Sequence, residues 1–73
     1  MFAFSHAIYA ITPDQPDTQL LIGQVRAALK AGVRLVQYRD KISPMAVKLA
    51  RARALNHLCQ SCGAQLIIND DVV

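Results

Sequence analysis

The hydrophobic positions of this chain fall into short apolar runs separated by longer segments with helical periodicity. The apolar runs cover residues 7–12, 34–38 and 65–68, and each ends at polar or turn-forming residues. Short runs rich in β-branched and aromatic residues with such boundaries are typical of strands. The pattern therefore predicts three strands over these ranges.

The first segment between the strands predicts a helix. The loop "TPDQPDT" precedes it, and either Asp17 or Thr18 can cap its first turn. The helix is expected to continue to about Ala31, with Gly32 in the left-handed conformation that ends many helices. Its apolar positions recur at helical spacing: Leu21, Val25, Ala28 and Leu29.

The second segment predicts a longer helix. Ser43 is expected to cap it with Pro44 at its first position, and the helix is expected to end near Cys62, before Gly63. One charged residue, Arg51, interrupts its predicted core stripe, which consists of Val47, Ala50, Ala54, Leu55, Leu58 and Cys62.

The pair of cysteines in "CQSC", Cys59 and Cys62, lies at the end of this helix. A redox-active C-x-x-C motif should instead open a helix, where the helix dipole lowers the pKa of a thiol. A zinc site would need two further ligands, and the chain has only His6 and His57 to offer as histidines. We therefore expect two reduced thiols packed in the last turn.

The order β-α-β-α-β, with a repeat of about 30 residues, is typical of right-handed βαβ units. The expected fold class is therefore α/β, with a parallel sheet. Both helices should cover the same face of that sheet, which leaves the other face without a partner.

The composition is typical of a globular chain, and it limits the kinds of partner that the chain is expected to bind. The chain has 73 residues, 53% of them hydrophobic, a mean hydropathy of +0.25 and a formal charge of +3. Its basic residues are dispersed and no aromatic series accompanies them, which argues against nucleic-acid binding. The opening lacks the features of a signal peptide, and no apolar segment is long enough to span a membrane. A cytoplasmic protein without membrane attachment is expected.

Polar residues follow each predicted strand, as "TPD", "QYRDK" and "NDD". In parallel sheets with helical crossovers all three segments lie at the C-terminal edge, where ligands bind in α/β folds. At strand spacing Gln37, Arg39 and Lys41 share one face, and Val36 and Tyr38 the other. An amide, a guanidinium and an ammonium group together suit a phosphate or pyrophosphate. In the alternative, Arg39 pairs with a carboxylate such as Asp40, and Lys41 is simply solvated.

The acidic pair after the third strand could bind a metal ion. Mg²⁺ takes one or two carboxylates beside phosphate oxygens, and Asp70 or Asp71 could supply one. In the alternative these residues form an Asx turn or cap a following helix, a role that suits Asp71 better. No pattern of nucleophile and base is present, so no catalytic residue is proposed. Tyr9, His6 and His57 receive no role.

Three segments in order, "YAIT", "VQYRDK" and "GAQLIINDD", resemble thiamine phosphate synthase, and their spacing fits that family. The resemblance implies that residues 1–73 are the N-terminal part of a single (β/α)₈ TIM-barrel domain. It implies an enzyme that joins hydroxymethylpyrimidine diphosphate to thiazole phosphate and releases pyrophosphate, with Mg²⁺ assisting. The family often has Glu at the position of Asp40. By the resemblance Asp70 is the metal ligand, and the substrate-binding residues are Gln37, Tyr38, Arg39, Asp40, Lys41 and Asn69.

The chain is shorter than a complete barrel, and two alternatives to the synthase stay open. A barrel of this kind needs roughly 200 residues or more, so the chain alone is expected to be inactive. It is expected to be marginally stable or to associate with copies of itself through its uncovered face. A related thiazole tautomerase has a similar Arg-x-Lys motif, although Gln37 before it favours the synthase. The other alternative is a non-catalytic βαβαβ module that forms a homo-oligomer.

Overall fold

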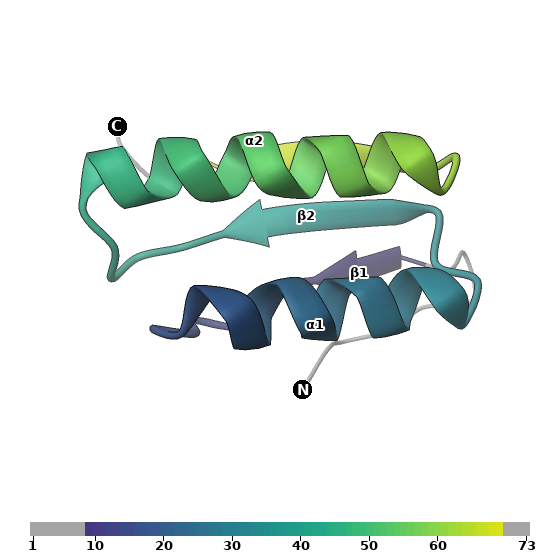
Figure 1. Ribbon diagram of the computed structural model, residues 1–73, viewed down its shortest axis with the longest axis horizontal. Helices are drawn as coiled ribbons and strands as arrows, with labels where there is room; N and C mark the ends of the chain where they lie inside the picture. The colour runs from purple at the N-terminus through teal and green to yellow at the C-terminus, as the bar shows by residue number, and fades with distance from the viewer. Residues whose placement is uncertain (1–8, 70–73) are drawn as a thin grey trace.

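The computed structural model describes residues 9–69, which form three strands and two helices in alternation (Figure 1). Their order confirms the predicted β-α-β-α-β arrangement. Within these residues no helix is both long and apolar enough to cross a membrane. The elements are β1 (Tyr9–Ile11), α1 (Thr18–Lys30), β2 (Leu35–Arg39), α2 (Met45–Ser61) and β3 (Gln65–Asn69).

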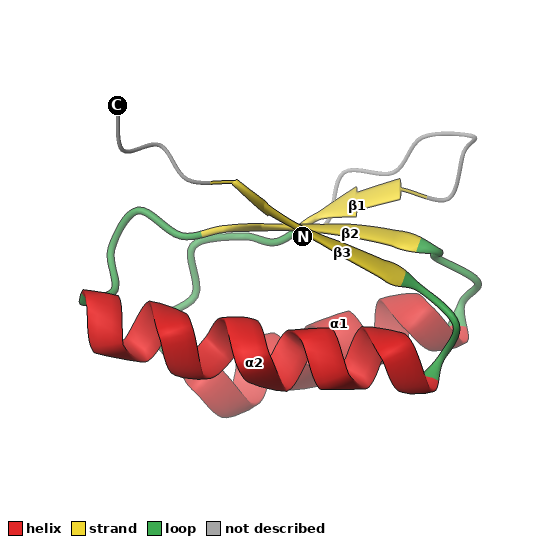
Figure 2. Ribbon diagram, turned by 90° about the horizontal axis from the view of Figure 1, so that it is seen from above, coloured by secondary structure: helices red, strands yellow, loops and turns green. Residues whose placement is uncertain are grey.

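The three strands make one parallel sheet in the order β1-β2-β3. Both helices pack on the same side of this sheet (Figure 2), as expected for successive crossovers of one hand. Tyr9 lies opposite Leu35 in the register of β1 and β2, and Arg39 lies opposite Asn69 in that of β2 and β3. The predicted fold class is therefore confirmed.

The hydrophobic core lies between the sheet and the helices. Along β2 burial alternates, so that Val36 and Tyr38 are buried beneath the helices. Gln37 belongs to the opposite face, which neither α1 nor α2 covers (Figure 2). We call these the covered face and the open face of the sheet. The buried residues of the core are Ala10, Leu21, Val25, Ala28, Leu29, Val33, Val36, Tyr38, Leu55 and Cys59.

The two helices begin in different ways. Asp17 caps α1, because its Oδ1 accepts hydrogen bonds of 2.9 and 3.2 Å from two amides of the first turn. Helix α2 was predicted to start at Pro44 under a Ser43 cap, but it begins at Met45 with Pro44 as the N-cap residue and no side-chain cap. The amide of Ser43 instead donates to Oδ1 of Asp40, at 3.0 Å. The carboxylate of Asp40 therefore organises the turn before α2.

The buried side of α2 differs from the predicted stripe. Its buried residues are Arg51, Leu55 and Cys59, each four positions after the last, so the residue that interrupted the stripe belongs to the core. Both cysteines are free, with Cys59 buried as expected and Cys62 exposed. The prediction was wrong at three positions, which are exposed: Ala50, Ala54 and Cys62.

Candidate functional site

A row of hydrogen-bonded side chains crosses the open face from β1 to β3. The Nε2 of Gln37 donates to the hydroxyl of Tyr9 at 2.7 Å, and the Nδ2 of Asn69 donates to the Oε1 of Gln37 at 2.8 Å. Each residue comes from a different strand, and each is only partly buried. The hydroxyl hydrogen of Tyr9 and the carboxamide oxygen of Asn69 have no partner among residues 9–69. This polar row can therefore offer hydrogen bonds to a ligand on the open face.

The structure brings together two of the predicted site residues, Gln37 and Asn69, and adds Tyr9, to which the sequence assigned no role. The run that contains Tyr9 is apolar at nearly every position, so alternation alone does not separate its two faces. The buried Ala10 next to it and the pairing of Tyr9 with Leu35 place the tyrosine on the open face. This information comes from the three-dimensional structure and not from the local sequence pattern.

Arg39 ends β2 at the C-terminal edge of the sheet. Strand alternation places it on the same face as Gln37, as predicted, and the register places it opposite Asn69. Thr12, which is buried, fixes its backbone from the end of β1. The amide of Arg39 donates to Oγ1 of Thr12 at 3.0 Å, and that hydroxyl donates to the carbonyl of Arg39 at 3.3 Å.

Lys41 lies in the loop after β2, two residues beyond the end of the strand. The strand alternation that was used to group it with Gln37 and Arg39 no longer applies there, and that part of the prediction stays a prediction. Its exposed position is set by the loop, since its amide donates to Oδ1 of Asp14 at 3.2 Å. Residues 12–14 therefore contact the backbone of both basic site residues.

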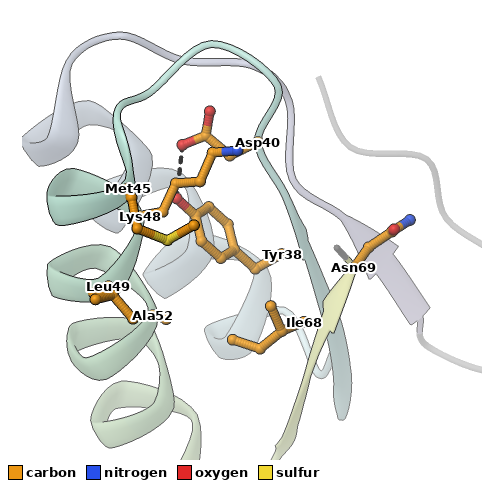
Figure 3. Close-up of a pocket in the computed structure, with 8 residues that line it drawn as sticks. All are labelled: Tyr38, Asp40, Met45, Lys48, Leu49, Ala52, Ile68 and Asn69. Atoms are coloured by element: carbon orange, nitrogen blue, oxygen red, sulfur yellow. Dashed lines mark hydrogen bonds between the residues drawn. The ribbon is translucent and has the colours of Figure 1, made fainter. Parts of the chain in front are cut away.

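Tyr38 and Asp40 lie on the other side of the sheet. The hydroxyl of Tyr38 donates to Oδ2 of Asp40 at 2.6 Å, as Figure 3 shows. The same oxygen forms a buried ion pair with Arg51, whose NH1 nitrogen is 3.3 Å away. The structure thus groups these two predicted site residues with α2 and not with the polar row. Their contact with a substrate stays a prediction.

The surroundings of this buried pair determine its charge. Burial alone would raise the pKa of Asp40, but hydrogen bonds from Tyr38 and Ser43 lower it well below its ordinary value. Burial and the neighbouring Asp40 carboxylate raise the pKa of Tyr38 far above its ordinary value. Asp40 is therefore a carboxylate and Tyr38 a neutral phenol near neutral pH. Neither is poised to exchange protons in that range.

A hollow of about 180 Å³ lies between α2 and the end of β3 (Figure 3). Its outer part is formed by Met45, Leu49 and Ile68, which are 62%, 54% and 52% exposed. Asn69 is at its border, but its side chain points away from the hollow in Figure 3. The lining of the hollow is mainly apolar, although it also includes Lys48 and the pair of Tyr38 and Asp40, and the hollow meets the polar row only at its border residue Asn69.

The predicted metal ligand, Asp70, lies outside the described residues, as do Asp71 and His6. Within residues 9–69 no group of three or more His, Cys, Asp or Glu could hold a metal ion. Asp70 directly follows Asn69, the residue that ends the polar row. A carboxylate together with the oxygens of a phosphorylated ligand is the type of donor set that Mg²⁺ prefers, and the assignment of Asp70 to that role stays a prediction.

Comparison with known proteins identifies relatives along almost all of the chain. It is 46% identical over 72 residues to the thiamine-phosphate synthase of Thiobacillus denitrificans, covering 99% of this chain and 34% of that protein. It is 51% identical over 65 residues to the enzyme of the same name from Marinobacter nauticus, covering 88% of this chain and 29% of that protein. No solved structure matches.

These matches cover only part of the relatives, because the chain spans about a third of their length. The family described as "Thiamine monophosphate synthase" matches residues 8–73, which include the whole described structure. That family has a TIM-barrel fold. A parallel βαβαβ unit with both helices on one face of its sheet has the arrangement of one part of such a barrel. This chain belongs to the thiamine monophosphate synthase family.

Proposed function

We propose that this chain acts in thiamine biosynthesis as part of a transferase that joins hydroxymethylpyrimidine diphosphate to thiazole phosphate and releases pyrophosphate. Membership of the family and the names of the relatives support this proposal. The observation that carries it furthest is the row from Tyr9 through Gln37 to Asn69, with Arg39 beside it at the C-terminal edge. A heteroaromatic ligand and a charged tail would each meet suitable groups there.

The polar row suits the pyrimidine. The ring nitrogens and amino group of a pyrimidine alternate acceptor and donor along one edge, and a carboxamide can meet both kinds. Gln37 is held on both sides, by Tyr9 and by Asn69, so its amide is fixed in one orientation before the ligand arrives. Pre-ordering of this kind lowers the entropy cost of binding.

The basic residues suit the diphosphate. Departure of pyrophosphate builds negative charge on its oxygens, and fixed positive groups beside them lower the barrier. In our proposal Arg39 binds these oxygens through its planar fork, and Lys41 adds a charge from the neighbouring loop. Asp70 would hold the magnesium ion, which neutralises charge on the leaving group when bound.

Tyr38 and Asp40 take an indirect part in this proposal. Their side chains face the helices, so they hold the backbone of residues 37–41 in place from behind. Any contact of these two residues with the substrate would then come from their backbone groups.

Titration of the 73-residue chain with inorganic pyrophosphate, followed by NMR, tests the anion part of the site. Arg39→Gln should weaken binding about tenfold, because a hydrogen bond between charged groups is lost. Arg53→Gln is the matched control, since Arg53 is exposed on α2. Equal losses in both variants would indicate nonspecific charge attraction and contradict the proposal.

The pyrimidine part is tested by comparing the affinity for hydroxymethylpyrimidine diphosphate with that for pyrophosphate. Gln37→Ala should remove most of the gain that the pyrimidine provides. Gln65→Ala should leave that gain intact, because Gln65 lies two positions before the partner of Gln37 on β3, at the far end of the open face. A gain that survives Gln37→Ala would rule out the polar row as the pyrimidine site.

A further inference from the structure

Arg51 is a buried arginine that α2 places beneath the C-terminal edge of the sheet. It is 1% exposed, and its guanidinium donates to four acceptors. Its Nε donates to Oγ1 of Thr18 at 2.9 Å, and its NH2 nitrogen to the carbonyl of Pro16 at 2.9 Å. Its NH1 nitrogen donates to the carbonyl of Gln15 at 2.7 Å and to Oδ2 of Asp40 at 3.3 Å.

Three of these acceptors belong to two different loops, and the fourth, Thr18, is the first residue of α1. Gln15 and Pro16 lie in the loop after β1, and Asp40 opens the loop after β2. Residues 12–17 form the first loop and residues 40–44 the second. One side chain from a third element therefore ties together both loops at the edge where the proposed site lies.

The same two loops hold the two residues proposed to bind the anion: Arg39 ends β2 directly before the second loop, and Lys41 lies within it. From the first loop, Thr12 holds both backbone groups of Arg39, and Asp14 accepts from the amide of Lys41. From the second, Asp40 accepts the amides of the turn that follows Lys41, at 3.0 Å each. The first loop thus lies between Arg51 on one side and the backbone of the two basic residues on the other.

Stability alone does not account for an arginine at this position. Burying an ion pair costs desolvation, and apolar residues of similar volume often serve a core equally well. The next buried positions along α2 are Leu55 and Cys59, which shows that this side of the helix packs with small and apolar residues. Only the guanidinium can reach the carbonyls of both Gln15 and Pro16 together with Asp40.

We infer that Arg51 is a positioning residue that couples the loops at residues 12–17 and 40–44 and so sets the placement of Arg39 and Lys41. This inference rests on the proposed function, because it assigns those two residues to pyrophosphate. Arg51 itself is buried and does not contact the ligand; it acts through the two loops.

Three variants separate positioning from support of the fold. Arg51→Met removes the guanidinium but leaves the carboxylate of Asp40 buried without its ion pair. The double variant Arg51→Met with Asp40→Asn also removes that charge, and the asparagine oxygen can still accept the amides of the turn before α2. Arg53→Met, on the exposed side of the same helix, is the matched control.

Urea unfolding, amide hydrogen exchange and pyrophosphate titration should be measured on the 73-residue chain for each variant. In the double variant we expect the unfolding midpoint to return close to that of the unaltered chain. The amides of Asp17 and of residues 41–43, which donate hydrogen bonds in the structure, should nevertheless exchange about tenfold faster, because the common anchor of the two loops is missing. Affinity for pyrophosphate should stay about tenfold weaker, while Arg53→Met changes neither quantity.

Full recovery of loop protection and of pyrophosphate affinity together with stability would overturn the inference, because Arg51 would then act only through the fold. If the unaltered chain does not bind pyrophosphate, the assignment of Arg39 and Lys41 to that anion in the proposed function fails, and the anion part of this inference fails with it. Loop exchange that still rises in the double variant would in that case support the coupling of the two loops by Arg51.

Discussion

The two faces of the sheet are built from the same three strands but carry different kinds of residue. On the covered face Ala10, Val36 and Tyr38 lie beneath the helices. On the open face the residues next to them along the strands include Tyr9 and Gln37, which are only partly buried and hydrogen bonded to each other. In β1 and β2 a shift of one residue changes a core position into a partly buried position on the open face.

The difference shows how a short chain separates stability from recognition. The polar groups of the covered face are few, and Asp40 and Arg51 satisfy each other there. On the open face the row through Gln37 leaves some of its polar groups without a partner among residues 9–69, and we propose that a ligand uses them. Substitutions on the covered face should therefore mainly change the free energy of unfolding. Substitutions on the open face should mainly change the affinity for a ligand.

The largest effect is expected for Leu55→Ala on the covered face. Leu55 is fully buried, and such truncations cost about 2–5 kcal/mol through lost burial and the cavity that remains. Leu35→Ala, on the partly buried open face, should cost less than half as much. Urea denaturation of both variants measures the difference, and similar losses would mean that the open face is also a packed core.

An intermediate effect is expected from pH and the buried carboxylate. The pKa of Asp40 is lower in the folded chain than in the unfolded chain, so its contribution to stability is present above about pH 4. It should be lost progressively as the pH falls below that value, by about 1–3 kcal/mol. Unfolding midpoints measured from pH 7 to pH 2 should show this loss.

Asp40→Asn should lower stability at pH 7, because Arg51 then stays buried without a counter-charge. The same change should reduce the fall of the unfolding midpoint between pH 4 and pH 2. Asp17→Asn is the control, since asparagine also caps a helix. A profile that stays unchanged in Asp40→Asn would show that other carboxylates cause the acid sensitivity.

The smallest effect on stability is expected for Tyr9→Phe on the open face. Loss of the hydroxyl removes one hydrogen bond from Gln37, but the site is partly exposed and water can replace it, so the cost should stay below about 1 kcal/mol. The side-chain amide of Gln37 should become more mobile in NMR relaxation. An amide that is equally rigid without the hydroxyl would show that Asn69 alone fixes it.

The elements were predictable because their signals are local. The apolar runs defined the strands to within a few residues, and Gly32 and Gly63 end their helices with positive φ angles of 109° and 71°. Strand alternation correctly placed Gln37 and Arg39 on one face and Tyr38 on the other. The resemblance to the family assigned all of residues 37–41 to substrate binding. It did not distinguish residues whose side chains could contact a ligand from residues whose side chains support the strand from behind.

The remaining features depend on long-range contacts that no local pattern encodes. Arg51 looked like an interruption in an apolar stripe, because its acceptors are backbone carbonyls 35 and 36 residues away. Tyr9 looked like a core residue, because its partner Gln37 is 28 residues away and is brought close only by the register. Ser43 looked like a cap, because the sequence does not show that Asp40 organises the turn.

The sheet order β1-β2-β3 is also the order of synthesis. Each new strand joins the edge left by the one before it, and no later strand must insert between two that have already paired. The hydrogen bonds of β1 to β2 can therefore form before β3 has left the ribosome, and α1 can cover them at once. A chain with this connectivity can fold progressively during translation, one βα unit at a time.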